Sequence, residues 1–221
     1  MTTNKLKIIL TGATGMVGEG VLHECLNSDQ VESVLVVNRK PCGYTHPKLK
    51  EILHNDFYNL NPIKEQLQGY NTCLFCLGTT SVGKNEEEFT KVSYTLTMHF
   101  AETVVNNNMV FEYISGAGTD STEKGKIMWA RVKGKTENDL MKLPFKKVYN
   151  LRPGMLLPTK GMKNTLSYYK YLGLLTRIAL FLFPGIGSKL SQLGQTMIKL
   201  AVEVPADLTH IEIKDIKRLS K

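Results

Sequence analysis

The sequence has no apolar run long enough to span a membrane. The longest, YLGLLTRIALFLFPG at residues 171–185, is interrupted by Arg177 and is shorter than the roughly 20 apolar residues that a membrane-spanning helix needs. The opening segment MTTNKLKIILTG has fewer consecutive apolar residues than the core of a secretory signal peptide. We therefore expect a cytoplasmic protein without stable membrane insertion. We interpret residues 171–185 as a buried helix, with a membrane-surface helix as the alternative.

Residues that bind metals or form disulfides are also scarce. The chain has 4 cysteines, and its 5 histidines form no HExxH or other ligand-spaced cluster. Two of the cysteines, Cys73 and Cys76, lie three apart in CLFC. On a strand, residues three apart point to opposite faces, so these two are expected to be separate core thiols. We predict no metal site.

The charge is unbalanced toward the basic side. Lys and Arg number 28 against 20 Asp and Glu, a formal net charge of +8, which favours anionic partners. The basic residues are spread along the chain and accompany no nucleic-acid-binding motif, so no nucleic acid partner is expected. With 221 residues, of which 42% are hydrophobic, the chain can form one globular domain.

Strand-like and helix-like segments alternate over the first two thirds of the chain. Strands are predicted at 5–10, 31–38, 49–56, 70–78, 110–116 and 146–154, and helices after the first glycine turn and at 63–68, 86–108 and 128–143. This alternation indicates an α/β fold with a doubly wound parallel sheet and helices on both faces. Helix-like stretches at 164–183 and 190–203 and a closing strand-like segment at 210–219 follow. Residues 155–221 should form a small, mostly helical, substrate-side lobe of the same domain.

A glycine-rich turn, TGATGMVG, follows the first strand and precedes the first helix. Gly12, Gly15 and Gly18 let the backbone turn tightly and approach a pyrophosphate, whose charge is stabilised by free N–H groups and the helix N-terminus. The same turn should place Thr14, Met16 and Val17 beside the ligand. In this position the motif predicts a Rossmann-type dinucleotide site.

The second predicted strand ends in VVNRK, a basic turn. An acidic residue here would bind the ribose 2′-hydroxyl of NAD, but this chain has Asn38, Arg39 and Lys40. Arginine and lysine suit a 2′-phosphate. We therefore predict NADP(H) in preference to NAD(H).

Two more strand ends should reach the same crevice. Asp56 and Phe57 end the third predicted strand, where a carboxylate and a backbone N–H can bind adenine. Leu77, Gly78 and Thr79 end the fourth, where small residues let the chain pass beside the cofactor. Ligands of open α/β sheets bind at the carboxyl ends of the strands, so these residues are expected in one cofactor site.

In this order, TGATGMVG, NRK, NDF, CLGTT, SGAG, MWARVKGK and LRPGMLLP resemble the atypical and extended short-chain dehydrogenases/reductases. The chain is most similar to the small NAD(P)-binding proteins described as NmrA-like or NAD-dependent epimerase/dehydratase, including the Tat-interacting oxidoreductase-like proteins. The resemblance covers about residues 5–160. It implies a tyrosine as general acid/base, a lysine four residues later that lowers the tyrosine pKa and binds the nicotinamide ribose, and a serine or threonine after the fifth strand that orients the substrate.

By this resemblance, Lys133 matches the lysine and Ser115 the serine. Pro153 and Gly154, with the preceding arginine, match the segment that lines the nicotinamide pocket. Trp129 occupies the tyrosine position, and an indole N–H donates hydrogen bonds but cannot exchange a proton. An alternative alignment, with Lys135 as the lysine and Arg131 at the tyrosine position, supplies no tyrosine either.

Three functions therefore remain open. The first is an NADP(H)-dependent reductase of altered mechanism that acts on an unknown small molecule. Its proton would come from Ser115, Thr119, a water held by Lys133, or a tail tyrosine (Tyr168, Tyr169 or Tyr171). The second is a non-catalytic NADP(H) redox sensor or partner-binding module. The third, a nucleotide-sugar epimerase, is disfavoured because that chemistry needs the tyrosine and a larger C-terminal domain. The chain is expected to be a monomer or a homodimer.

Overall fold

The computed structural model describes residues 5–159, 161–165, 176, 178 and 180–221. Its centre is a seven-stranded parallel sheet with strand order β3-β2-β1-β4-β5-β6-β9. The strands are β1 (Leu6–Thr11), β2 (Val31–Asn38), β3 (Leu49–Leu53), β4 (Thr72–Phe75), β5 (Val110–Ile114), β6 (Lys147–Arg152) and β9 (His210–Glu212). The order reverses between β1 and β4, which creates the crevice where ligands bind in such sheets.

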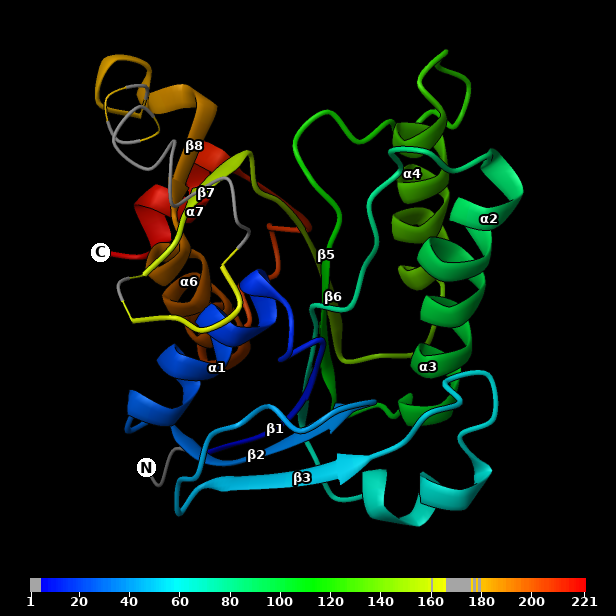
Figure 1. Ribbon diagram of the computed structural model, residues 1–221, viewed down its shortest axis with the longest axis vertical. Coiled ribbons are helices and arrows are strands. Elements are labelled where there is room, and N and C mark those ends of the chain that lie inside the picture. Colours follow the sequence, from blue (N-terminus) through cyan, green and yellow to red (C-terminus); the bar gives the residue numbers. More distant parts are fainter. Residues whose placement is uncertain (1–4, 160, 166–175, 177, 179) are drawn as a thin grey trace.

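Helices cover both faces of the sheet, as Figure 1 shows. On one face lie α1 (Met16–Asn27), α6 (Leu190–Glu203) and α7 (Ile213–Leu219). On the other lie η1 (Asn61–Leu67), α2 (Glu86–Thr90), η2 (Lys91–Thr95), α3 (Leu96–Val104) and α4 (Met128–Leu140). The predicted doubly wound fold is confirmed, and the C-terminal helices complete one of its two layers.

Alternating strand residues supply two hydrophobic cores. In β1, Ile8 and Leu10 pack toward α1 and α6, whereas Ile9 packs toward α3. All three are fully buried, as expected for a parallel sheet with both faces covered. Cys73 and Cys76 belong to these two different cores, so the prediction of two separate thiols is confirmed.

Several predicted elements have different bounds in the structure. The third strand ends at Leu53, not at residue 56, because the chain turns there and the His54 ring contacts the carbonyl oxygens of Asp56 (2.7 Å) and Asn59 (2.8 Å). The helix predicted at 63–68 is a 3-10 helix. The helix predicted at 86–108 contains a π-helical turn at Lys91–Thr95 and ends at Val104.

The C-terminal tail is more helical than predicted. The helix expected at 190–203 is confirmed as α6, but the segment expected as a closing strand has only three strand residues, His210–Glu212, before α7 begins. The capping box between Glu212 and Asp215 starts this helix. Most of the helix predicted at 164–183 lies outside the described residues. A short second sheet joins β7 (Met155–Leu157) to β8 (Gly187–Lys189), and η3 (Pro184–Ile186) precedes β8.

Candidate dinucleotide site

The glycine turn joins β1 to α1 at the switch point of the sheet. Gly12 has φ +74°, and a Cβ on it would lie 2.8 Å from the backbone of Cys76 and Leu77. Gly15 is the N-cap of α1, and its N–H donates to the carbonyl of Gly12 at 2.9 Å. A Cβ on Gly18 would overlap the carbonyl of Gly12. The turn is thus a side-chain-free surface at a helix N-terminus, which suits a pyrophosphate.

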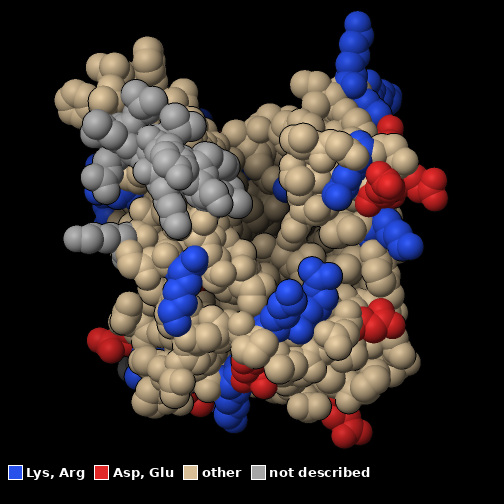
Figure 2. All heavy atoms as spheres, viewed as in Figure 1, with Lys and Arg blue, Asp and Glu red and all other residues tan. Residues whose placement is uncertain are grey.

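A cleft of about 170 Å³ opens beside this turn. Its lining residues come from the carboxyl ends of β1, β2 and β4 and from the segment after β3: Gly12, Thr14, Gly15, Val37, Asn38, Arg39, Phe57, Cys76, Leu77 and Gly78. Figure 2 shows a hollow above several Lys and Arg side chains on this face of the molecule. About half of the residues predicted to contact the cofactor therefore line one cleft.

Local hydrogen bonds fix the walls of the cleft. The Leu77 N–H donates to Oγ1 of Thr11 at 3.2 Å, which holds the chain after β4 against β1. The Asn38 side chain is buried and its Nδ2 donates to Oε1 of Glu51 at 3.4 Å. Phe57 is buried and stacks on Phe100, with ring centroids 6.1 Å apart. The side chains of this part of the cleft are therefore either apolar or engaged in hydrogen bonds within the protein.

The basic residues after β2 are exposed, and only Arg39 of the two lines the cleft. Lys40 lies next to it on the surface. Asp56 is exposed, and its carboxylate accepts the N–H of Tyr58 at 2.9 Å. Asp56, Lys40 and Thr79 are not among the residues that line the cleft, and Met16 and Val17 pack against the hydrophobic core.

A second group of predicted site residues gathers between α4 and the ends of β5 and β6. The Lys133 ammonium donates to the carbonyl oxygen of Ser115 and to that of Ile114, the latter at 3.4 Å. Burial lowers the pKa of Lys133 to about 8, and the nearby Glu137 opposes this shift. Lys133 is therefore largely charged at neutral pH and close to titration.

The hydroxyl groups of Ser115 and Thr119 both donate to backbone carbonyls. Ser115 Oγ donates to the carbonyl of Leu151 at 3.1 Å, and Thr119 Oγ1 donates to that of Gly116 at 2.8 Å. Trp129 lies on the first turn of α4, with its indole against Gly118. Tyr168, Tyr169 and Tyr171 lie outside the described residues.

The segment after β6 frames this second group. The carbonyl of Pro153 accepts the N–H of Ala117 at 2.9 Å, and a Cβ on Gly154 would overlap the carbonyl of Ile186. Arg152 instead forms a buried ion pair with Glu137 of α4. Glu137 was not predicted as a site residue from the sequence. Its position one helical turn after Lys133 indicates that the two side chains lie on the same side of the helix.

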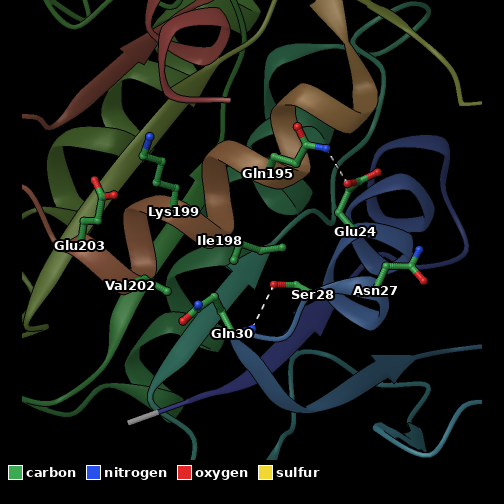
Figure 3. Close-up of a pocket in the computed structure, with 9 residues that line it drawn as sticks. All are labelled: Glu24, Asn27, Ser28, Gln30, Gln195, Ile198, Lys199, Val202 and Glu203. Atoms are coloured by element: carbon green, nitrogen blue, oxygen red, sulfur yellow. Dashed lines mark hydrogen bonds between the residues drawn. The ribbon is translucent and has the colours of Figure 1, made fainter. Parts of the chain in front are cut away.

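A second depression is lined by the C-terminal half of α1 and by α6. Figure 3 shows the residues that line it, at the end of α1 and along α6. Its volume is about 420 Å³. It contains Glu24, Lys199 and Glu203 but no residue of the glycine turn or of the Lys133 group. Gln195 spans it with a 3.0 Å hydrogen bond to Glu24. The described residues include no cluster of metal-ligating side chains.

The chain shares its fold with solved epimerases and dehydrogenases. The chain superimposes on Helicobacter pylori ADP-L-glycero-D-manno-heptose-6-epimerase with a TM-score of 0.68 and 14% identity, covering 98% of this chain and 81% of that one. It superimposes on the Bordetella bronchiseptica enzyme WbmF, determined in complex with NAD+, with a TM-score of 0.64 and 13% identity, covering 96% and 74%. The fold is that of the short-chain dehydrogenases/reductases and epimerases.

The sequence is also similar to two groups of named proteins. The mitochondrial protein FMP52 of Debaryomyces hansenii is 28% identical over 155 residues, 69% of this chain and 67% of that protein. Protein HTATIP2 of Rattus norvegicus is 25% identical over 153 residues, 68% of this chain and 62% of that protein. The resemblance to the Tat-interacting oxidoreductase-like proteins is confirmed. No family model matches the chain.

The prediction of a cytoplasmic protein is wrong, because the FMP52 relatives are named as mitochondrial proteins. It rested on a short N-terminal apolar run, which bears on secretion, whereas mitochondrial targeting depends on amphipathic, arginine-rich segments. Within the ranges that the structure covers, no helix is long and apolar enough to cross a lipid bilayer.

Proposed function

We propose that the protein binds NADP(H) across the carboxyl ends of β1, β2 and β4. The observation that carries this proposal is the convergence of the glycine turn, the N-terminus of α1 and Arg39 in one cleft. The turn and the helix N-terminus would hold the pyrophosphate, and the wall formed by Phe57 and Leu77 would face the adenine end. NAD bound to the solved neighbour WbmF supports the cofactor class.

Charge favours the phosphorylated cofactor. The residues that line the cleft include Arg39 and no carboxylate, and Lys40 is exposed beside it. A guanidinium can bind a 2′-phosphate through two hydrogen bonds, whereas an adenosine without that phosphate leaves it unpaired. Arg39 and Lys40 are thus proposed as the 2′-phosphate site.

We place the nicotinamide end beside Lys133. Its ammonium already donates to the carbonyl oxygens of Ile114 and Ser115 and can donate a further hydrogen bond to a ribose hydroxyl. Pro153 and Gly154 would face the ring from the end of β6. Ser115, at the start of the loop after β5, would position the substrate.

The proposed reaction is reduction of a carbonyl compound. When bound, the reduced nicotinamide supplies a hydride to the carbonyl carbon. The carbonyl oxygen then needs a proton, which Lys133 can deliver through one water because its pKa lies near neutrality. Trp129 lacks a titratable oxygen and would form one wall of the substrate pocket.

One observation favours the alternative, a non-catalytic NADP(H) sensor. Both Ser115 and Thr119 direct their hydroxyl hydrogens to backbone carbonyls. In this arrangement neither side chain is free to donate a proton to a substrate. Similarity to nucleotide-sugar epimerases concerns the fold alone, so this third function is not supported further.

Calorimetric titration with NADPH, NADP+ and NADH tests the proposal. We expect NADPH to bind more tightly than NADH. Equal or tighter binding of NADH would refute the cofactor preference, and absence of all binding would refute the site. Oxidation of bound NADPH by a panel of aldehydes and ketones separates the reductase from the sensor. The FMP52 relatives support mitochondria as the compartment, which organelle fractionation can check.

A further inference from the structure

An apolar surface runs from the first turn of α4 to the start of β7, past the place proposed for the nicotinamide. Cη2 of the Trp129 indole lies 3.6 Å from the position of a Cβ added to Gly118. The residue before this glycine, Ala117, donates its N–H to the carbonyl of Pro153 at 2.9 Å. Two residues later, Met155 begins β7. A series of contacts therefore connects Trp129 to Met155 across the ends of β5 and β6.

Large apolar side chains at both ends of this surface are open to solvent. Ile127, the N-cap residue of α4, is 58% exposed. Met155 is 41% exposed, and Ile186, whose carbonyl closely approaches Gly154, is 42% exposed. Figure 1 shows α4 and β7 on opposite sides of β5 and β6, and Figure 2 shows a hollow between these two parts of the molecule. Apolar side chains around a hollow commonly mark a ligand site.

The cations next to this surface already have partners. The Arg152 guanidinium pairs with Glu137 and Glu212, and the Lys133 ammonium donates to two backbone carbonyls. A carboxylate or phosphate on the substrate would have to displace these partners, which costs the hydrogen bonds that they make. The arrangement therefore favours an uncharged substrate, although the net charge of the whole chain is +8.

We infer that the substrate is a carbonyl compound with a long apolar chain and no anionic group. The inference rests on the proposed function for the reaction, and on the apolar surface for binding. The carbonyl group would lie beside Lys133, and the chain would extend over Trp129 toward Met155 and Ile186. Reduction would break the C=O π bond, form a C–H bond with the hydride of the reduced nicotinamide and place a proton on the oxygen. The products would be an alcohol and the oxidised cofactor.

The fluorescence of Trp129 tests the inference, because this residue is the only tryptophan of the chain. We expect butanol, hexanol and octanol, the alcohols that apolar aldehydes would yield, to shift its emission to shorter wavelengths as the indole loses contact with water. Alcohols are used because an aldehyde can form an imine with Lys133. The Kd should fall about threefold for each added methylene group, because each one removes further apolar surface from water.

Three variants locate the apolar chain. Met155→Asp and Ile186→Asp should each raise the Kd for octanol about tenfold or more, because a carboxylate would replace an apolar contact. The matched control is Met141→Asp at the other end of α4, where the side chain is 37% exposed, and it should leave the Kd unchanged. Equal thermal unfolding temperatures would show that the variants are folded.

The titrations are repeated in the presence of NADP+, and calorimetry with NADPH is run in parallel on each variant. A Kd that does not depend on chain length, or octanoate bound as tightly as octanol, would overturn the inference. An equal loss of octanol binding in Met141→Asp would overturn it as well. Chain-length-dependent binding by a protein that does not bind NADPH would contradict the proposed reductase but support the apolar site.

Discussion

The guanidinium of Arg152 and the carboxylate of Glu137 form a buried ion pair between β6 and α4. Nε of Arg152 lies 3.0 Å from Oε1 of Glu137, and the second oxygen pairs with a terminal nitrogen of the same guanidinium. The Glu137 side chain is 0% exposed and that of Arg152 is 12% exposed. Glu212 of β9 accepts from Arg152 at 3.3 Å. This pair fixes the helix that carries Lys133 relative to the end of the sheet.

Breaking this pair should be costly. Arg152→Leu leaves Glu137 charged and buried, so we expect the free energy of unfolding to fall by roughly 3–5 kcal/mol. Urea denaturation measures it. Lys135→Ala is the control, because it breaks an exposed pair with Asp139 and should cost about 1 kcal/mol or less. The free energy of unfolding should fall less in the double variant Glu137→Leu/Arg152→Leu than in Arg152→Leu, because no charge is left buried without its partner. Equal losses would contradict the burial argument.

The glycine turn allows a second comparison. Gly12 and Gly69 both have positive φ, but an added Cβ meets the Cys76 and Leu77 backbone at Gly12 and nothing within 4 Å at Gly69. Gly69→Ala should therefore cost only the conformational strain of about 1–2 kcal/mol. Gly12→Ala should cost more and should weaken NADPH binding, as thermal unfolding and calorimetry can measure. Similar losses in both variants would show that close approach is unimportant.

Much of this architecture could be predicted from local sequence. The strands are apolar runs buried on both faces, so Val31–Asn38 was predicted with its observed bounds. The glycine turn was recognised because Gly12, Gly15 and Gly18 follow a strand and precede a helix. These signals are contained within a few neighbouring residues, which is why the strand, turn and helix around Gly12 could be predicted.

The remaining features depend on contacts between distant residues. The partner of Arg152 is Glu137, which is contributed by another element, and neither residue type indicates the pairing by itself. Residues 210–219 have an alternating pattern that suggests a strand, but only His210–Glu212 reach the edge of β6, and Ile216 packs on the core as part of α7. The π-helical turn at Lys91–Thr95 likewise leaves the helical spacing of apolar residues intact.

Arg39 should decide between the two cofactors. Arg39→Ala removes a charged donor from the cleft, and a charge-assisted hydrogen bond is worth about 1.5–3 kcal/mol, so the Kd for NADPH should rise roughly tenfold to a hundredfold. The Kd for NADH should change little. Lys124→Ala, on an exposed loop, is the control for the loss of one positive charge. An equal rise in the Kd for NADH would argue against a contact between Arg39 and the 2′-phosphate.

Lys133 should give the protein a pH-dependent stability. Burial lowers its pKa in the folded state to about 8 from the ordinary 10.5, so between these pH values the unfolded chain binds more protons. The free energy of unfolding therefore receives a contribution that rises with pH over this range. Lys133→Met should lack this pH-dependent contribution. We expect the variant to be more stable than the wild type at pH 7, and this difference in the free energy of unfolding should decrease toward pH 10. A pH-independent difference in urea denaturation would show that Lys133 does not titrate in this range.

Trp129 provides the test of catalysis. It lies one helical turn before Lys133 on α4, so Trp129→Tyr would place a phenol on the same side of the helix as the ammonium. A positive charge nearby lowers the pKa of a phenol and makes it a better proton donor. We expect Trp129→Tyr to raise NADPH oxidation with a panel of carbonyl compounds by about tenfold or more, since general acid catalysis contributes on the order of a hundredfold.

Two further variants show whether such a gain depends on the proton. Trp129→Phe removes the indole without adding a hydroxyl and should show no gain. Trp129→Tyr/Lys133→Met keeps the phenol but removes the charge that would lower its pKa, so the gain should be lost. If Trp129→Tyr binds NADPH as tightly as the wild type and yet oxidises none of it, the site is missing more than a proton donor. That result would support the sensor and contradict the reductase.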